Sequence, residues 1–323
     1  MKRPTFTDEG PECKSEYKTG QHWSYDVNTV APIRFAAKGI ASEAGCPATT
    51  VPRLFQKAVE TSGSNPALRI EQPCPPFNAE EKKAAPSAPF DNWKTWTYKQ
   101  YYDETSLVAR AFLSLGLQRK DAVCIYGFNS PEWVMAEQGG IMAGGIAAGI
   151  YPSDTPQQVI FKAKHSSASI AVCQQGKDTI FENAVRAGRL PNLKAIVVWG
   201  ADQPTADILC PGRQTVRKIS WNNLAEFGNL TAESVLDEII ARTEPGEVCA
   251  YIYTSGTTGT SHSLFFVFIW YCFECFVYFN TYTYTYILFA DELSLFCCNN
   301  HYHHYSSYTF LRFFNLIFKL IYS

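Results

Sequence analysis

A short run of hydroxyl side chains and glycines contains the groups best suited to bind a ligand in this sequence. The run consists of Thr254, Ser255, Gly256, Thr257, Thr258 and Gly259. Its glycines let the backbone curl so that successive N–H groups point at one centre, and its hydroxyls add donors for phosphate oxygens. The apolar residues 248–253 directly before it have the composition of a buried strand. We therefore expect a loop at the end of a strand that holds the phosphates of a nucleotide.

The sequence of this 254–259 loop excludes two common phosphate-binding motifs. It lacks the lysine of a Walker A motif, and it does not fit the dinucleotide-binding fingerprint. Residues 253–259 instead resemble, position by position, the signature Tyr-Thr-Ser-Gly-Thr-Thr-Gly-x-Pro-Lys-Gly of AMP-forming acyl- and aryl-CoA synthetases. The resemblance then stops, because Ser261, His262 and Ser263 stand where that family has Pro, Lys and Gly. A mostly neutral imidazole is a weak replacement for a permanent ammonium beside phosphates.

Apolar segments of strand composition alternate with helical patterns before the loop. Strands are expected at residues 67–70, 93–97, 122–126, 146–151, 169–173 and 195–198, and helices at 51–59, 98–115, 131–142, 156–165, 178–187, 221–227 and 232–242. This alternation predicts an α/β fold, a doubly wound and mostly parallel sheet with helices on both faces. Ligands of such sheets bind beyond the carboxyl ends of the strands, which is where the 254–259 loop is expected.

Several polar residues and glycines in this pattern have a structural interpretation. Thr97 is expected to cap the helix that follows it, and Ser130 with Pro131 is typical of a helix start. The glycines of residues 139–145 are expected to let a helix lie close to its neighbours rather than to contact a ligand. Asn129 and Trp133 are expected to cap and to pack in the same way.

The resemblance to known enzymes extends beyond the loop. Residues 127–133, 139–145 and 149–151 look like the amino-terminal half of long-chain acyl-CoA synthetases of the bubblegum type, and the likeness covers roughly residues 51–260. It implies a ligase that uses ATP to activate a long-chain fatty acid as an acyl-adenylate, with release of pyrophosphate, and then transfers the acyl group to coenzyme A. The alternatives are another adenylate-forming ligase, acting on aryl or medium-chain acids, and a non-catalytic membrane-tethered protein.

The family resemblance also implies roles for individual residues. The 254–259 loop would hold the β- and γ-phosphates of ATP, with Thr257 and Thr258 as hydroxyl donors, and Mg²⁺ would neutralise phosphate charge. No protein nucleophile is needed, and no catalytic or metal-binding residue is assigned. In the family the remaining parts of the active site follow this loop. The 64 residues after Gly259 resemble none of them, so we expect a truncated and inactive fragment of a parent enzyme.

The segment from residue 261 to 323 differs from the rest of the chain. It contains no Gly and no Pro, although ordinary chains carry roughly 7% and 5% of them. One interpretation is a short membrane span at residues 264–279, which Glu274 interrupts. A second is a zinc site built from Cys272, Cys275 and the later Cys and His residues, whose spacing does not fit a zinc ribbon. The favoured interpretation is translated non-coding sequence, from a retained intron or a frameshift.

These observations divide the chain of 323 residues into three parts. Residues 1–50 form an amino-terminal extension, residues 51–260 a partial AMP-binding (adenylation) domain with a proline-rich insertion at 72–92, and residues 261–323 an aberrant or membrane-prone tail. The net charge of -2 gives no sign of nucleic-acid binding. Dispersed cysteines without paired spacing predict an intracellular protein, either cytoplasmic or peripheral on the cytosolic face of a membrane.

Overall fold

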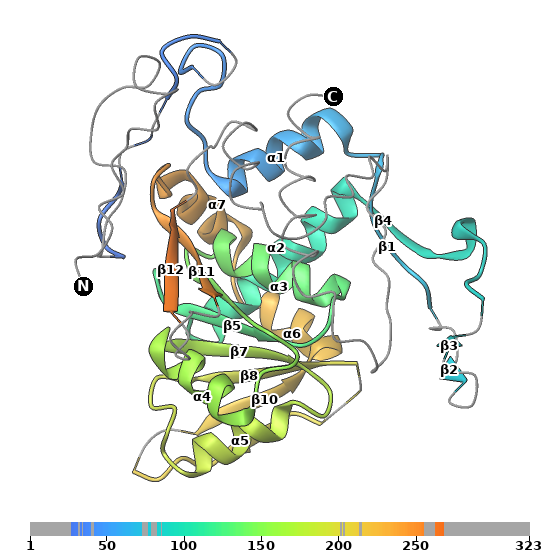
Figure 1. Ribbon diagram of the computed structural model, residues 1–323, viewed down its shortest axis with the longest axis vertical. Coiled ribbons are helices and arrows are strands. Elements are labelled where there is room, and N and C mark those ends of the chain that lie inside the picture. Colours follow the sequence, from blue (N-terminus) through green and yellow to red (C-terminus); the bar gives the residue numbers. More distant parts are fainter. Residues whose placement is uncertain are drawn as a thin grey trace.

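Within the described residues of the computed structural model, eight strands form one sheet in the order β12-β11-β6-β5-β7-β8-β10-β9 (Figure 1). The structure describes residues 27–31, 33, 35–39, 42–72, 77–78, 83–84, 86–200, 202, 204–212, 215–254 and 262–267. The strands from β11 to β10 pair in parallel, and the two edge strands β12 and β9 pair antiparallel with their neighbours. The strands are β5 (Ala122–Tyr126), β6 (Ile146–Ile150), β7 (Ala168–Gln174), β8 (Ala195–Trp199), β9 (Ala206–Ile208), β10 (Val216–Ser220), β11 (Val248–Thr254) and β12 (His262–Val267).

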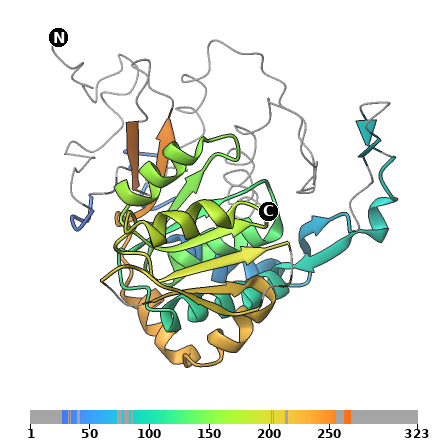
Figure 2. The same cartoon turned by 90° about the horizontal axis from the view of Figure 1, so that it is seen from below.

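Helices cover both faces of this sheet, as Figure 2 shows. Side chains of α4 and α5 pack on one face, and side chains of α1, α2, α3, α6 and α7 pack on the other. The helices are α1 (Val51–Ser62), α2 (Tyr98–Ser114), α3 (Pro131–Met142), α4 (Pro156–His165), α5 (Asp178–Arg186), α6 (Leu224–Gly228) and α7 (Glu233–Arg242). The predicted doubly wound, mostly parallel α/β sheet is therefore confirmed.

The composition of the central strands explains why they are central. Every residue of β5 and β8 is buried, and successive side chains of β5 enter opposite cores, Val123 and Ile125 on one side and Cys124 on the other. A parallel strand covered by helices on both faces needs such a continuous apolar run. An alternating strand would place polar side chains in one of the two cores.

Local signals at the helix starts act as the sequence predicted. Thr97 and Gln100 form a reciprocal capping box at the start of α2, and the Ser130 hydroxyl accepts a hydrogen bond from the Trp133 backbone N–H at the start of α3. The glycines of α3 have the expected packing role. A Cβ added to Gly139 would lie 2.9 Å from Val108 Cγ1 of α2, and one added to Gly140 would lie 3.1 Å from Val123 Cγ2 of β5.

Three strands of the sheet were not predicted: β10, its neighbour β9 at one edge, and β12 at the other edge, whose residues 262–267 lie in the segment interpreted as the tail. Strand β10 has the sequence Val-Arg-Lys-Ile-Ser, and its two charged residues hid the strand pattern. Lys218 belongs there because its ammonium lies 2.6 Å from carboxylate oxygens of both Asp178 and Glu182 on α5. Strand β9 is only three residues long, and Asp207 on it pairs with Arg217 of β10. The partners of Lys218 are 36 and 40 residues away in the sequence, whereas Arg217 and Asp207 are 10 residues apart.

The proline-rich segment leaves the fold between two paired strands. Strand β1 (Pro66–Ile70) pairs antiparallel with β4 (Lys94–Thr97), so the chain between them departs from the body and returns, at the right of Figure 1. Within it the structure describes the short strands β2 (Phe77–Asn78) and β3 (Lys83–Ala84) and the 3₁₀ turn Phe90–Asn92. The base of the segment is fixed because the Ala88 N–H and the Glu71 carboxylate form a hydrogen bond of 2.5 Å.

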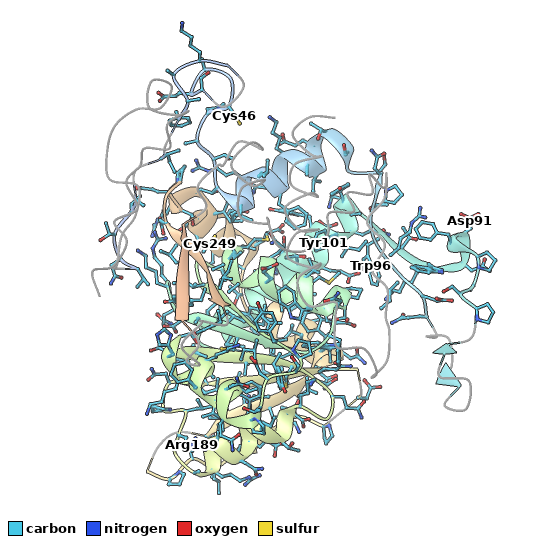
Figure 3. All side chains as sticks on the ribbon, viewed as in Figure 1. Cys46, Asp91, Trp96, Tyr101, Arg189 and Cys249 are labelled. Carbon is cyan, nitrogen blue, oxygen red and sulfur yellow. The ribbon has the colours of Figure 1, made fainter. Side chains whose placement is uncertain are left out.

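The interface of α2 and α3 contains an unusual buried carboxyl group. Glu137 on α3 is only 4% exposed, and burial raises its pKa to about 8 because the charged form loses its hydration. The nearby Tyr101 of α2 lies in the same interior (Figure 3), and its pKa is raised by burial and then by the charge of Glu137. Among the described residues the Tyr101 hydroxyl has no hydrogen-bond partner.

Replacing Glu137 is expected to change the pH dependence of stability. The folded state keeps this carboxyl protonated up to about pH 8, whereas the unfolded chain releases the proton near the ordinary value of 4.5. The unfolded state therefore binds fewer protons between these values, and the free energy of unfolding falls as pH rises, by about 3 kcal/mol at pH 7. We expect Glu137→Gln to remove this loss when urea unfolding is measured from pH 5 to 8. The matched control is Glu60→Gln on the exposed side of α1, and equal slopes for Glu137→Gln and the unaltered chain would contradict the prediction.

Candidate phosphate-binding site

The carboxyl ends of four neighbouring parallel strands meet at one edge of the sheet. Strand β11 ends there at Thr254, beside the turn after β6, and the connections after β5 and β7 follow along the same edge. Helices α3 and α4 begin at this edge, with Ser130 and Thr155 as their caps. The N–H groups and the positive dipole ends at helix N-termini favour anions, so this edge is suited to a phosphate ligand.

The predicted 254–259 loop begins at this edge. Thr254 is the last residue of β11, and its backbone pairs with that of His262 in β12. Ser255, Gly256, Thr257, Thr258 and Gly259 lie outside the described residues, as do Thr260 and Ser261. Thr254 and His262, the described residues on either side of this stretch, are paired at one end of the antiparallel strands β11 and β12. His262, the residue at the position of the family's lysine, starts the second strand.

Tyr253, directly before the loop, is fixed by helix α4. Its hydroxyl donates a hydrogen bond to the Lys162 carbonyl at 3.1 Å and lies 3.2 Å from Nδ1 of His165. Tyr253 is 2% exposed, and burial is the main cause of its raised pKa. The residue that begins the seven-residue resemblance is thus a buried part of the core and not a surface residue.

Two charged residues of this site were missed by the sequence analysis. Lys162 on α4 is 1% exposed, and its ammonium lies 2.5 Å from Oδ2 of Asp154 in the turn after β6. A signal for it was present, because Lys162 lies between the buried Ile160 and Ala163 on the apolar side of α4. A charged residue at such a position needs a buried partner.

Aromatic side chains of the same edge surround a second lysine. The Lys177 ammonium lies 4.4 Å from the ring centre of Tyr126 and 5.5 Å from that of Phe128, and it donates to the Pro152 carbonyl at 3.1 Å. Desolvation lowers the pKa of Lys177.

Trp133 packs on the hydrophobic core and beside Gly149, so its predicted packing role is confirmed.

Among the described residues, no three or more His, Cys, Asp or Glu side chains cluster in the arrangement of a metal site. The cysteines and histidines of the tail considered for zinc lie outside the described residues.

Of the apolar run 264–279, residues 264–267 belong to β12, and the others are not described. No helix in the described part of the chain has the length and hydropathy needed to cross a membrane.

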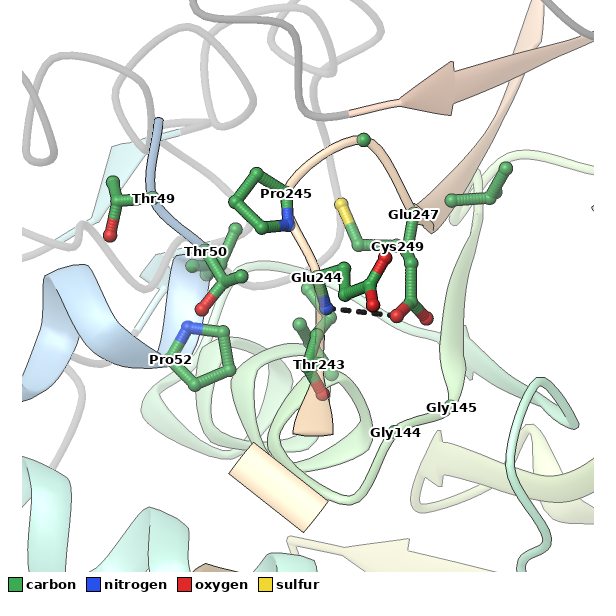
Figure 4. Close-up of a pocket in the computed structure, with 14 residues that line it drawn as sticks. Thr49, Thr50, Pro52, Gly144, Gly145, Thr243, Glu244, Pro245, Glu247 and Cys249 are labelled. Atoms are coloured by element: carbon green, nitrogen blue, oxygen red, sulfur yellow. Dashed lines mark hydrogen bonds between the residues drawn. The ribbon is translucent and has the colours of Figure 1, made fainter. Parts of the chain in front are cut away.

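A small hollow lies at the opposite end of the parallel strands, near the amino end of β11 (Figure 4). It is lined by the start of α1, the end of α3 and the turn at residues 243–249, which includes the half-buried thiol of Cys249. The Glu244 N–H donates to the Glu247 carboxylate across this turn at 2.9 Å. The hollow is therefore separate from the strand ends that precede the 254–259 loop.

Comparisons with known proteins agree with this arrangement. Residues 77–262 match the model of the AMP-binding enzyme family. The chain is 34% identical over 237 residues to the long-chain-fatty-acid–CoA ligase ACSBG2 of Gallus gallus, an alignment that covers 73% of this chain and 27% of the relative. It is 33% identical over 211 residues to the ligase ACSBG1 of Rattus norvegicus, covering 65% and 26%. The chain thus spans about a quarter of the length of these relatives.

A solved structure shares the fold. The anthranilate CoA ligase AuaEII, in complex with anthranoyl-AMP, superposes with a TM-score of 0.50 at 20% identity, covering 68% of this chain and 35% of that one. The family match ends at residue 262, where β12 begins, and it includes every strand of the parallel sheet together with the predicted loop. The chain belongs to the family of AMP-binding enzymes.

Proposed function

We propose that this chain is the amino-terminal part of a long-chain fatty acid–CoA ligase of the AMP-forming type. The observation that carries the proposal is the position of the seven-residue signature 253–259. It starts on a buried residue at the carboxyl end of a parallel-paired strand, inside the region that matches the AMP-binding family. The names of the relatives, which are long-chain-fatty-acid–CoA ligases, support the choice of substrate.

In the proposed reaction the protein mainly positions and neutralises charged groups. The carboxylate of the fatty acid attacks the α-phosphate of ATP and pyrophosphate leaves. The thiol of coenzyme A then attacks the acyl carbon of the adenylate, the bond from that carbon to the phosphate oxygen breaks, and AMP leaves. Backbone N–H groups of the 254–259 loop and the hydroxyls of Thr257 and Thr258 would bind the β- and γ-phosphates. Mg²⁺, when bound, would neutralise part of the phosphate charge.

The same comparisons lead us to propose that this polypeptide alone is inactive. It spans about a quarter of the relatives with which it aligns, and His262 stands where the family signature has lysine. The match to the family model ends at residue 262. The described residues therefore supply the strand ends that precede the proposed loop, and we identify no acyl pocket or coenzyme A site among them.

ATP–pyrophosphate exchange measures the first half-reaction directly. With a long-chain fatty acid and Mg²⁺, we expect this polypeptide to give exchange no higher than the background without enzyme, because it aligns with only about a quarter of these ligases and has His262 at the position of the signature lysine. A full-length ligase such as the Gallus gallus relative serves as the positive control under the same conditions. Exchange above background that requires the fatty acid would show that the chain is active and overturn this part of the proposal.

Binding of ATP tests the loop independently of catalysis. Removing a hydroxyl that donates to a charged phosphate costs about 1.5 kcal/mol or more, which is roughly tenfold in affinity. We expect Thr257→Val and Thr258→Val each to raise the Kd for ATP by about this factor in isothermal titration calorimetry. The matched control is Thr205→Val, which removes the same hydroxyl from an exposed position outside the 254–259 loop. Unchanged affinity in both loop variants would exclude these hydroxyls from the site.

A further inference from the structure

A buried ion pair lies next to the end of β11 and has no part in the chemistry described above. The Lys162 side chain is 2% exposed and that of Asp154 is 10% exposed, and their charged atoms are 2.5 Å apart. Removing two charges from water costs several kcal/mol per ion, so a pair of this kind is a weak means of stabilising a fold. Its position suggests a more specific role.

Lys162 lies near two aromatic rings, one directly after β6 and one near the end of β11. Its ammonium lies 4.8 Å from the ring centre of Tyr151, directly after β6, and 5.3 Å from the ring centre of Tyr253, near the end of β11. Both distances are within the range at which a cation is attracted to an aromatic face. The Lys162 carbonyl also accepts the hydrogen bond of the Tyr253 hydroxyl. One residue of α4 therefore holds Tyr253 by both its ring and its hydroxyl.

Asp154 connects the same lysine to the turn after β6. Its carboxylate oxygen Oδ2 accepts the backbone N–H of Tyr151 at 3.2 Å as well as the Lys162 ammonium. Its backbone carbonyl accepts the Tyr126 hydroxyl at 3.3 Å, which adds a contact from β5. The ends of β5, β6 and β11 thus converge on one ion pair.

Backbone pairing alone does not hold the end of β11 to its parallel neighbour. The pairing with β6 joins Ala250 to Ala147 and Tyr251 to Ala148. Within the described residues it ends there, two residues before Tyr253. Beyond Tyr251, the strand is held to α4 by the contacts of Tyr253 with Lys162 and His165.

We propose that Lys162, together with Asp154, is a positioning residue that fixes the end of β11 and so sets where the 254–259 loop begins. The inference rests on the proposed phosphate-binding function of that loop. Lys162 is buried and neutralised by Asp154, so it acts through Tyr253 and not by contact with the ligand. It differs in this way from the loop lysine of the family signature, whose position His262 occupies.

The test compares Lys162→Met with Lys164→Met, which removes an exposed lysine from the same helix. Two quantities are measured at a temperature where circular dichroism shows all proteins fully folded: hydrogen exchange of the Tyr253 and Thr254 amides, and the Kd for ATP. Loss of Lys162 is expected to speed the exchange and weaken ATP binding, each by roughly tenfold. Lys164→Met is expected to change neither.

Additional variants keep the test decisive if Lys162→Met does not fold. The pair Lys162→Met with Asp154→Asn leaves no unpaired buried charge, and Tyr253→Phe keeps the ring while removing the hydroxyl bonds. Both are expected to show faster exchange at the end of β11. Exchange equal to that of the unaltered chain in these folded variants would overturn the positioning role, whether or not ATP binds. If the variants show faster exchange but the unaltered chain binds no ATP, the phosphate-binding function of the loop is refuted and the role of Lys162 at the end of β11 still holds.

Discussion

The burial of parallel strands on both faces is the constraint on which this structure depends. A parallel pair needs a long crossover, and here each crossover from β5 to β8 contains a helix that must cover a face of the sheet. Strands such as β5 and β8 must then be apolar throughout. The same topology brings the carboxyl ends of neighbouring strands to one edge, and the polar connections of the fold collect there. The point at which the 254–259 loop begins, at the end of β11, is a consequence of this arrangement.

Two buried ionisable side chains, Glu137 and Lys162, have different consequences in the two halves of the core. Glu137 lies in the interface of α2 and α3, and it stays protonated well above its usual pKa because burial disfavours the charged form. Lys162 lies on the opposite side of the sheet and has a carboxylate partner at 2.5 Å. The first arrangement makes stability depend on pH. The second ties together three strand ends and gives the edge near the loop a defined geometry.

The sequence predicted the elements whose signals are local. Helices α2 and α3 begin at Thr97 and Ser130 because caps and proline act over three or four residues. Strand β10 escaped prediction because Lys218 at its centre is satisfied by two acidic residues of α5, some 36 to 40 positions away. The role of Lys162 was hidden for the same reason, since its carbonyl meets Tyr253 from 91 residues away. Contacts between distant segments cannot be read from periodicity or spacing.

The proposed function depends on the binding of ATP phosphates by the 254–259 loop. Amide resonances report such contacts residue by residue, and the two loop glycines are readily recognised in a ¹H–¹⁵N correlation spectrum. On titration with ATP and Mg²⁺, we expect the amide resonances of Gly256 and Gly259 to shift most, together with that of Thr254. Shifts confined to the hollow at residues 243–249, or a loop that does not respond to ATP, would contradict this expectation.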